Sequence, residues 1–159
     1  HHNDPLDPRY VKHLSVLTEP ISHLLSPGSE GIDFGCGPGP TVSHIMGDLG
    51  FKVNNYDPFF ENDKKLLTHT YDFLVSTETI EHFCHPYEDL HLMTSLVRKK
   101  GVMGIMTNFA DGRNFTDWFY TRDPTHIAFY SRNTFKWIAE RLGLKVELLE
   151  DPVAIFRIS

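Results

Sequence analysis

A glycine-rich turn with an acid in front of it is the segment of this sequence that most clearly predicts chemistry. It reads Asp33-Phe34-Gly35-Cys36-Gly37-Pro38-Gly39 and lies between an apolar segment, 31–34, and the helical pattern of 42–49. A strand, a glycine turn and a helix together form a nucleotide-binding unit. The dinucleotide motif requires a third small residue at position 40, where this chain has proline. The spacing therefore argues against an NAD-dependent oxidoreductase, although it leaves that alternative open.

The residues around the turn favour a cationic ligand. Asp33 would repel a pyrophosphate, but it would suit the α-amino group of S-adenosylmethionine (SAM), and Pro38 removes a backbone N–H that a phosphate would use. Asp57 ends the next predicted strand, where an acid can accept hydrogen bonds from two ribose hydroxyls. Phe59 and Phe60 follow, and we expect them to flank an adenine ring.

Hydrophobic periodicity predicts strands that alternate with helices around this turn. We expect strands at 31–34, 51–56, 71–76 and 102–107, and two closing strands at 144–149 and 153–158. We expect helices after Asp7, over 42–49, from Pro86 to Gly101 with Arg98, Lys99 and Lys100 in the last turn, and after Ser131. This order predicts an α/β fold with a Rossmann-like, doubly wound, mostly parallel sheet and an antiparallel C-terminal strand.

Length and composition predict one domain over residues 1–159, with an N-terminal helical segment at 1–28 and a substrate or lid loop at 108–130. No apolar run approaches the roughly 20 residues of a membrane span, and the polar start argues against a signal peptide. A net charge of −6 without a basic stripe argues against nucleic acid as a partner. The two cysteines form no disulfide framework. We therefore expect a cytoplasmic protein with neither a membrane nor a nucleic-acid partner.

Several motifs resemble those of class I SAM-dependent methyltransferases, in the small-molecule branch that includes ubiquinone-biosynthesis-type enzymes. They are the glycine turn, Asp57, Tyr71-Asp72-Phe73 followed by Glu78-Thr79-Ile80-Glu81-His82, and Asp123-Pro124-Thr125-His126-Ile127 with Phe129-Tyr130-Ser131. The resemblance covers about 31–158. It implies SAM as the methyl donor, a small-molecule methyl acceptor, and cofactor contacts from Gly35, Gly37, Gly39, Asp57, Thr77 and Glu78. Asp33, Cys36, Pro58 and Phe59 complete the predicted cofactor site.

One departure from the family concerns the interval between Asp57 and Tyr71, which is short. The family usually has a helix, a third strand and an adenine-contacting acid in that place. We therefore expect the sheet to have a shortened edge after its second strand.

A methyl acceptor is expected at 108–130, because this segment follows a strand at the carboxyl edge of the sheet and is rich in aromatic residues. His126 is the predicted general base, with Asp123 as its orienting partner. Tyr120 and Tyr130 are the predicted polar groups of the pocket, and His82 is the second candidate base. The alternative for His126 is a structural hydrogen bond that holds the loop to the sheet.

The group Glu78-x-x-Glu81-His82 is a candidate site for Mg²⁺ or Zn²⁺. Similar ubiquinone-type O-methyltransferases place a metal on such a group, whereas the alternative role is to cap neighbouring backbone groups. Three functions remain open at this point: a small-molecule methyltransferase, a non-catalytic SAM-binding domain, and an NAD-binding oxidoreductase.

Overall fold

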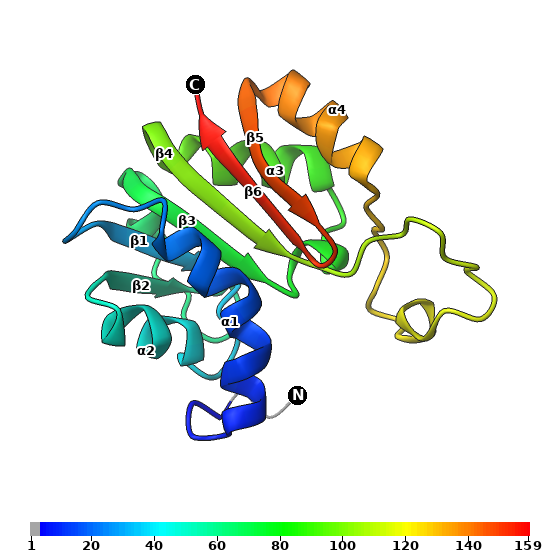
Figure 1. The fold of residues 1–159 in the computed structure, drawn as a ribbon, viewed down its shortest axis with the longest axis horizontal. Helices are drawn as coiled ribbons and strands as arrows, with labels where there is room; N and C mark the ends of the chain where they lie inside the picture. The colour runs from blue at the N-terminus through cyan, green and yellow to red at the C-terminus, as the bar shows by residue number, and fades with distance from the viewer. Residues whose placement is uncertain (1–3) are drawn as a thin grey trace.

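A six-stranded sheet with helices on both faces organises residues 4–159, the part of the chain that the computed structural model describes (Figure 1). The strands lie in the order β2-β1-β3-β4-β6-β5. Four strands run parallel: β1 (Glu30–Phe34), β2 (Lys52–Tyr56), β3 (Tyr71–Thr77) and β4 (Val97–Met106). β6 (Val153–Ile158) is antiparallel to β4 and to β5 (Leu144–Glu150). The predicted mostly parallel sheet with an antiparallel C-terminal strand is confirmed.

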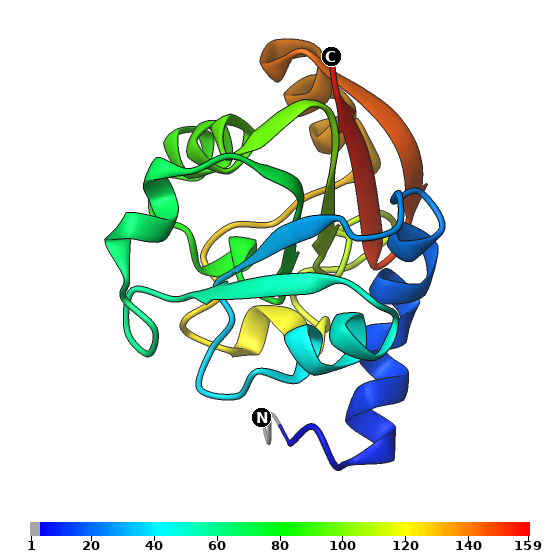
Figure 2. The same cartoon turned by 90° about the vertical axis from the view of Figure 1, so that its left-hand side faces the viewer.

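Two helices cover each face of this sheet (Figures 1 and 2). α1 (Pro8–Ser22) and α2 (Thr41–Asp48) lie on one face, and α3 (Pro86–Ser95) and α4 (Arg132–Leu142) lie on the other. Local capping explains where α1 and α4 begin, because Asp7 accepts a hydrogen bond from the Arg9 amide and Ser131 accepts one from the Thr134 amide. α4 ends at Gly143, which has the left-handed conformation that favours glycine. Among the described residues, no helix is long and apolar enough to span a membrane.

Three short 3₁₀ helices complete the connections: η1 (Lys64–Thr68), η2 (Ile80–His82) and η3 (Phe119–Arg122). Between β2 and β3 the chain forms η1 and no strand, so β2 is the outermost strand of the sheet. The expected shortened edge is therefore confirmed.

The helix predicted from Pro86 to Gly101 is wrong in its second half. α3 ends at Ser95, and the backbone from Val97 onward pairs with β3, where Val97 lies opposite Tyr71. Pairing with a buried strand satisfies these backbone groups along a whole ladder, which outweighs the local preference of cations for a helix end. Arg98 consequently lies on the strand, where its guanidinium pairs with Asp72 at 2.9 Å.

The two faces of the sheet each carry an apolar core. The core on the α3–α4 face includes Leu90, Met93, Phe135 and Ile138, and the core on the α1–α2 face includes Leu14, Leu17, Met46, Phe73 and Val75. Gly31 in β1 makes room for one of these side chains, because a Cβ there would overlap the fully buried Phe73 ring. The sheet is therefore closely packed at that point.

This packing predicts opposite effects for two glycine-to-alanine changes. Gly31→Ala should lower the free energy of unfolding by about 1–3 kcal/mol, because the Phe73 ring has no free space to move into. Gly47→Ala in α2 should raise it by about 0.5–1 kcal/mol, because an added Cβ there has no neighbour within 4 Å. Urea denaturation of both variants tests the packing, and equal stability of Gly31→Ala and wild type would contradict it.

Candidate cofactor and acceptor site

The predicted site residues lie at the carboxyl ends of the four parallel strands. The glycine turn follows β1, Asp57 follows β2, the residues from Glu78 to Glu81 follow β3, which ends at Thr77, and 107–130 follows β4. Figure 1 shows this last segment projecting beyond the arrowheads of β3 and β4. Open α/β sheets bind their ligands outside the carboxyl ends of the strands, so the fold positions all four segments for binding.

The glycine turn is fixed on two sides. The amides of Gly35 and Cys36 both donate to the carbonyl of Tyr56, at 2.8 and 3.1 Å. The Thr79 hydroxyl donates to the Gly35 carbonyl at 3.1 Å, and a Cβ on Gly35 would overlap that threonine. Gly35 and Gly37 have φ of 83° and 68°, a conformation that side chains rarely adopt. Thr77 is half-buried at the end of β3, beside this contact.

Asp57 ties the glycine turn to the end of β2. Its Oδ2 accepts a hydrogen bond from the Gly37 amide at 2.9 Å, and its Oδ1 accepts from the amides of Phe59 and Phe60 at 2.8 and 3.3 Å. The side chain is buried, whereas Pro58 and Phe59 are exposed, Phe59 to 87%. The structure thus shows an organising role for Asp57, and its ribose contact stays a prediction.

Asp33 is the acid of the glycine turn, and it is almost fully buried. It is 1% exposed, and its Oδ1 has no hydrogen-bond partner among the described residues. Burial and the neighbouring charge of Asp57 raise the pKa of Asp33 to about 7. The adjacent Cys36 is also buried, and burial together with the charges of Asp33, Asp57 and Glu61 raises the pKa of its thiol to about 12.

α1 contributes to this region, which was not predicted from the sequence. His13 lies 3.1 Å from Glu78, between Nε2 and Oε1, and stacks with Tyr10. Burial and the charges of Glu78 and Asp33 raise the pKa of Tyr10 to about 12. The available signal was the spacing of Tyr10 and His13, which places two polar rings on one face of a helix.

A fully buried acid, Glu81, holds the 107–130 segment against the turn after β3. Its carboxylate accepts hydrogen bonds from the hydroxyls of Tyr120 and Thr107, the latter at 3.1 Å. Its backbone carbonyl accepts from the amides of Ile127 and Ala128, at 2.9 and 3.0 Å. Burial raises the pKa of Glu81, while the bond from Tyr120 opposes that shift.

Two histidines lie beside this acid, with ring centroids 4.9 Å apart. His126 Nδ1 is 2.7 Å from the Tyr120 carbonyl, and His82 Nδ1 is 2.9 Å from the Thr125 carbonyl. A carbonyl can only accept, so each Nδ1 carries the hydrogen and each neutral ring has its lone pair at Nε2. The Tyr120 carbonyl therefore orients His126 through Nδ1. Asp123 Oδ2 lies 3.6 Å from the other nitrogen, Nε2, and its role as an orienting partner stays a prediction.

Tyr130, the other polar residue predicted for the pocket, is buried and donates its hydroxyl to the Ile80 carbonyl at 2.9 Å. It therefore joins the same two segments as Glu81, and its place in an acceptor pocket stays a prediction.

The structure assembles a different metal-ligating group from the one predicted. Glu81, His82 and His126 each offer a ligand atom within 4.8 Å of the others. Glu78 is not part of this group, because its backbone takes a φ of 50° and its carboxylate pairs with His13 of α1. Carbonyl acceptors fix both Nδ1–H groups, an arrangement common among metal-binding histidines. These three residues could therefore hold a divalent cation.

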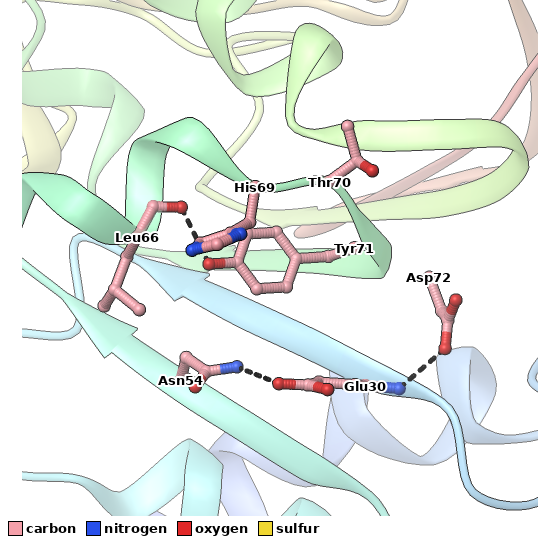
Figure 3. Close-up of a pocket in the computed structure, with 7 residues that line it drawn as sticks. All are labelled: Glu30, Asn54, Leu66, His69, Thr70, Tyr71 and Asp72. Carbon is pink, nitrogen blue, oxygen red and sulfur yellow. Dashed lines mark hydrogen bonds between the residues drawn. The ribbon is translucent and has the colours of Figure 1, made fainter.

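A cavity of about 350 Å³ lies at the other end of the strands (Figure 3). It is lined by Glu30, Asn54, Leu66, His69, Thr70, Tyr71 and Asp72. These residues belong to the beginnings of β1 and β3, the middle of β2, and η1 with the residues after it. The cavity is thus at the opposite edge from the glycine turn, where the shortened edge leaves space, and it is not the cofactor site.

The contacts of Asp57 predict that it stabilises the protein without any ligand. Asp57→Ala should lower the free energy of unfolding by about 1–3 kcal/mol, because three amides lose a largely buried acceptor. Thermal denaturation without ligand measures this effect, and SAM titration of the folded variant measures its binding role separately. An unchanged melting temperature would show that these hydrogen bonds do not hold the turn.

Comparison with known proteins agrees with this arrangement. The family model described as a methyltransferase domain matches residues 9–149, and no curated protein matches the sequence. A SAM-dependent methyltransferase from Archaeoglobus fulgidus has a TM-score of 0.67 at 16% identity, covering 93% of this chain and 99% of that one. An O-methyltransferase family protein from Burkholderia thailandensis has a TM-score of 0.65 at 12% identity, covering 94% and 57%.

Magnesium protoporphyrin IX methyltransferase from Synechocystis PCC 6803, solved with bound SAM, has a TM-score of 0.61 at 15% identity, covering 95% of this chain and 79% of that one. At these identities the solved structures establish the fold, while the family match covers most of the chain. The match decides against the NAD-dependent oxidoreductase that the sequence left open. The chain belongs to the methyltransferase domain family and has the Rossmann-like fold of class I SAM-dependent methyltransferases.

Proposed function

We propose that this protein, as one domain, transfers the methyl group of SAM to a small-molecule acceptor that binds beside the 107–130 segment, with His126 as general base. The observation that carries the proposal is the state of His126. Its Nδ1–H is held by a backbone carbonyl, so the neutral ring presents Nε2 as a proton acceptor at the carboxyl edge of the sheet.

The geometry of the glycine turn supports SAM as the methyl donor. Two left-handed glycines let the backbone approach a ligand, and Asp33 has a buried oxygen without a partner that suits an ammonium group. When bound, SAM supplies an electrophilic methyl group on a sulfonium. The residues of this chain then have to position the acceptor, exclude water and take up its proton.

The aromatic part of the 107–130 segment supports a small organic acceptor. Trp118 packs against Phe115, Tyr120 and Phe129 with ring centroids 5.1 to 5.8 Å apart. Phe119 and Ile127 on the same segment are exposed. An apolar wall of this kind excludes water from a displacement reaction, and an acceptor O–H or N–H would lose its proton to His126.

The base proposal predicts a specific loss of turnover. In assays of SAM consumption with a panel of phenols, amines and carboxylic acids, His126→Ala should lower kcat by about 10²–10⁴-fold and leave the SAM affinity unchanged. A variant that instead melts at a lower temperature and keeps its turnover would show that His126 is structural. Wild-type protein that binds SAM but methylates nothing in the panel would support a non-catalytic SAM-binding domain.

A divalent cation at Glu81, His82 and His126 is the second candidate for activating the acceptor, and it is favoured by the grouping of these ligand atoms. A bound cation would lower the pKa of a coordinated hydroxyl and so replace the base.

This candidate predicts that protein from which metal has been removed with EDTA binds Mn²⁺ or Zn²⁺. His82→Ala and His126→Ala should each weaken that binding about tenfold or more. Glu78→Gln is the matched control and should bind normally, because Glu78 pairs with His13. Titration calorimetry measures the affinities. Full activity in EDTA, with no binding of either ion, would contradict the metal candidate and leave His126 as general base as the only proposal.

A further inference from the structure

Asp33 is a carboxylic acid that is buried among apolar side chains. In β1 it lies beside Val75 of β3, and two residues before it Gly31 lies against the Phe73 ring. Because side chains alternate along a strand, Asp33 faces the side of the sheet that α1 and α2 cover. Its carboxyl is therefore enclosed between the sheet and these helices, with Oδ1 unpartnered among the described residues.

The charged and titratable groups near Asp33 come from α1, from the glycine turn and from the residues that follow β2 and β3. Asp57 follows β2, Glu78 follows β3, Tyr10 and His13 are on α1, and Cys36 is in the glycine turn. His13 is paired with Glu78, whereas neither Asp33 nor Asp57 has a salt bridge in the described part of the chain. The surroundings of Asp33 are therefore acidic, and no cation of residues 4–159 forms an ion pair with it.

A buried carboxyl without a cation or enough donors holds its proton more strongly than one in water. Burial and the Asp57 charge raise the pKa of Asp33 to about 7, so near neutral pH a large part of the ligand-free protein carries a proton there. An ammonium group placed against this carboxyl would supply the missing charge and lower its pKa, which drives the proton off.

We propose that Asp33 exchanges a bound proton for the ammonium group of the methyl donor, so that binding of SAM releases a proton to the solvent. This inference rests on the proposed function, since it assumes that SAM binds at the glycine turn. It adds a specificity rule: the turn selects ligands that carry the amino-acid cation, and it selects them more strongly as the pH rises.

The size of the effect follows from linkage. With an Asp33 pKa of about 7, each SAM should release about half a proton at pH 7 and about 0.9 of a proton at pH 6. Because the ligand-free form is the protonated one, acid favours the free protein. SAM affinity should therefore be about fivefold weaker at pH 6 than at pH 7.

Titration calorimetry at pH 6 and 7 tests this directly, in buffers of different ionisation enthalpy, because the slope of the observed enthalpy gives the protons released. Asp33→Asn should still fold, bind SAM more weakly, and show neither proton release nor the change in affinity with pH. Glu30→Gln at the other end of β1 should keep both. His13→Gln should keep the release, because His13 pairs with Glu78 and not with Asp33.

5′-Methylthioadenosine, which lacks the ammonium group, is the matched ligand and should bind without releasing a proton. SAM binding with no proton release from wild type, or equal release from Asp33→Asn, would overturn the inference and leave the proposed function standing. Release that disappears only in His13→Gln would overturn it in favour of the histidine. Wild type that fails to bind SAM at any pH would contradict the proposed function itself.

Discussion

The buried carboxylate and carbonyl of Glu81 form the contacts on which the conformation of the 107–130 segment depends. The 107–130 segment has little regular structure of its own, apart from η3 and a single bridge between Phe109 and Tyr130. Glu81 supplies acceptors for two hydroxyls and two amides that belong to this segment. A buried acid with these bonds satisfied is costly to move, so a segment without a sheet partner still takes one conformation. The histidine next to Glu81 and the one on the segment meet as a consequence.

Most of the fold could be predicted from the sequence, because local physics specifies it. The caps at Asp7 and Ser131, the stop at Gly143 and the period of the apolar residues all act within a few positions of the chain. The boundary between α3 and β4 could not be predicted, because it depends on β3, a partner distant in sequence. Arg98 favours a helix end by its charge, but Asp72 on β3 gives it an equivalent partner on the strand.

The candidate site divides in the same way. Sequence motifs predict the glycine turn, Asp57 and their place at the carboxyl edge of the sheet, since each motif lies directly after a strand. The composition of the metal-ligating group does not, because one left-handed residue, Glu78, sends its carboxylate toward α1 and away from Glu81. His126 takes the place of Glu78 in this group. It does so through contacts between two segments that are far apart in the sequence. Tyr10 and His13 were not predicted for the same reason: their spacing places two polar rings on one face of α1, but nothing local indicates that this face contacts the loop after β3.

The shortened edge of the sheet connects these features. Without a third strand, the chain after β2 closes on itself, with Asp57 and Glu61 exchanging backbone hydrogen bonds at 3.1 and 2.9 Å. Asp57 is held inside that closed turn and against Gly37, so its charge cannot move away from the neighbouring β1. Asp33 lies near the end of β1, where it is buried close to the charge of Asp57. Burial and this charge both raise the pKa of Asp33. The same hydrogen bonds that shape the glycine turn therefore make Asp33 hold a proton until a cation arrives.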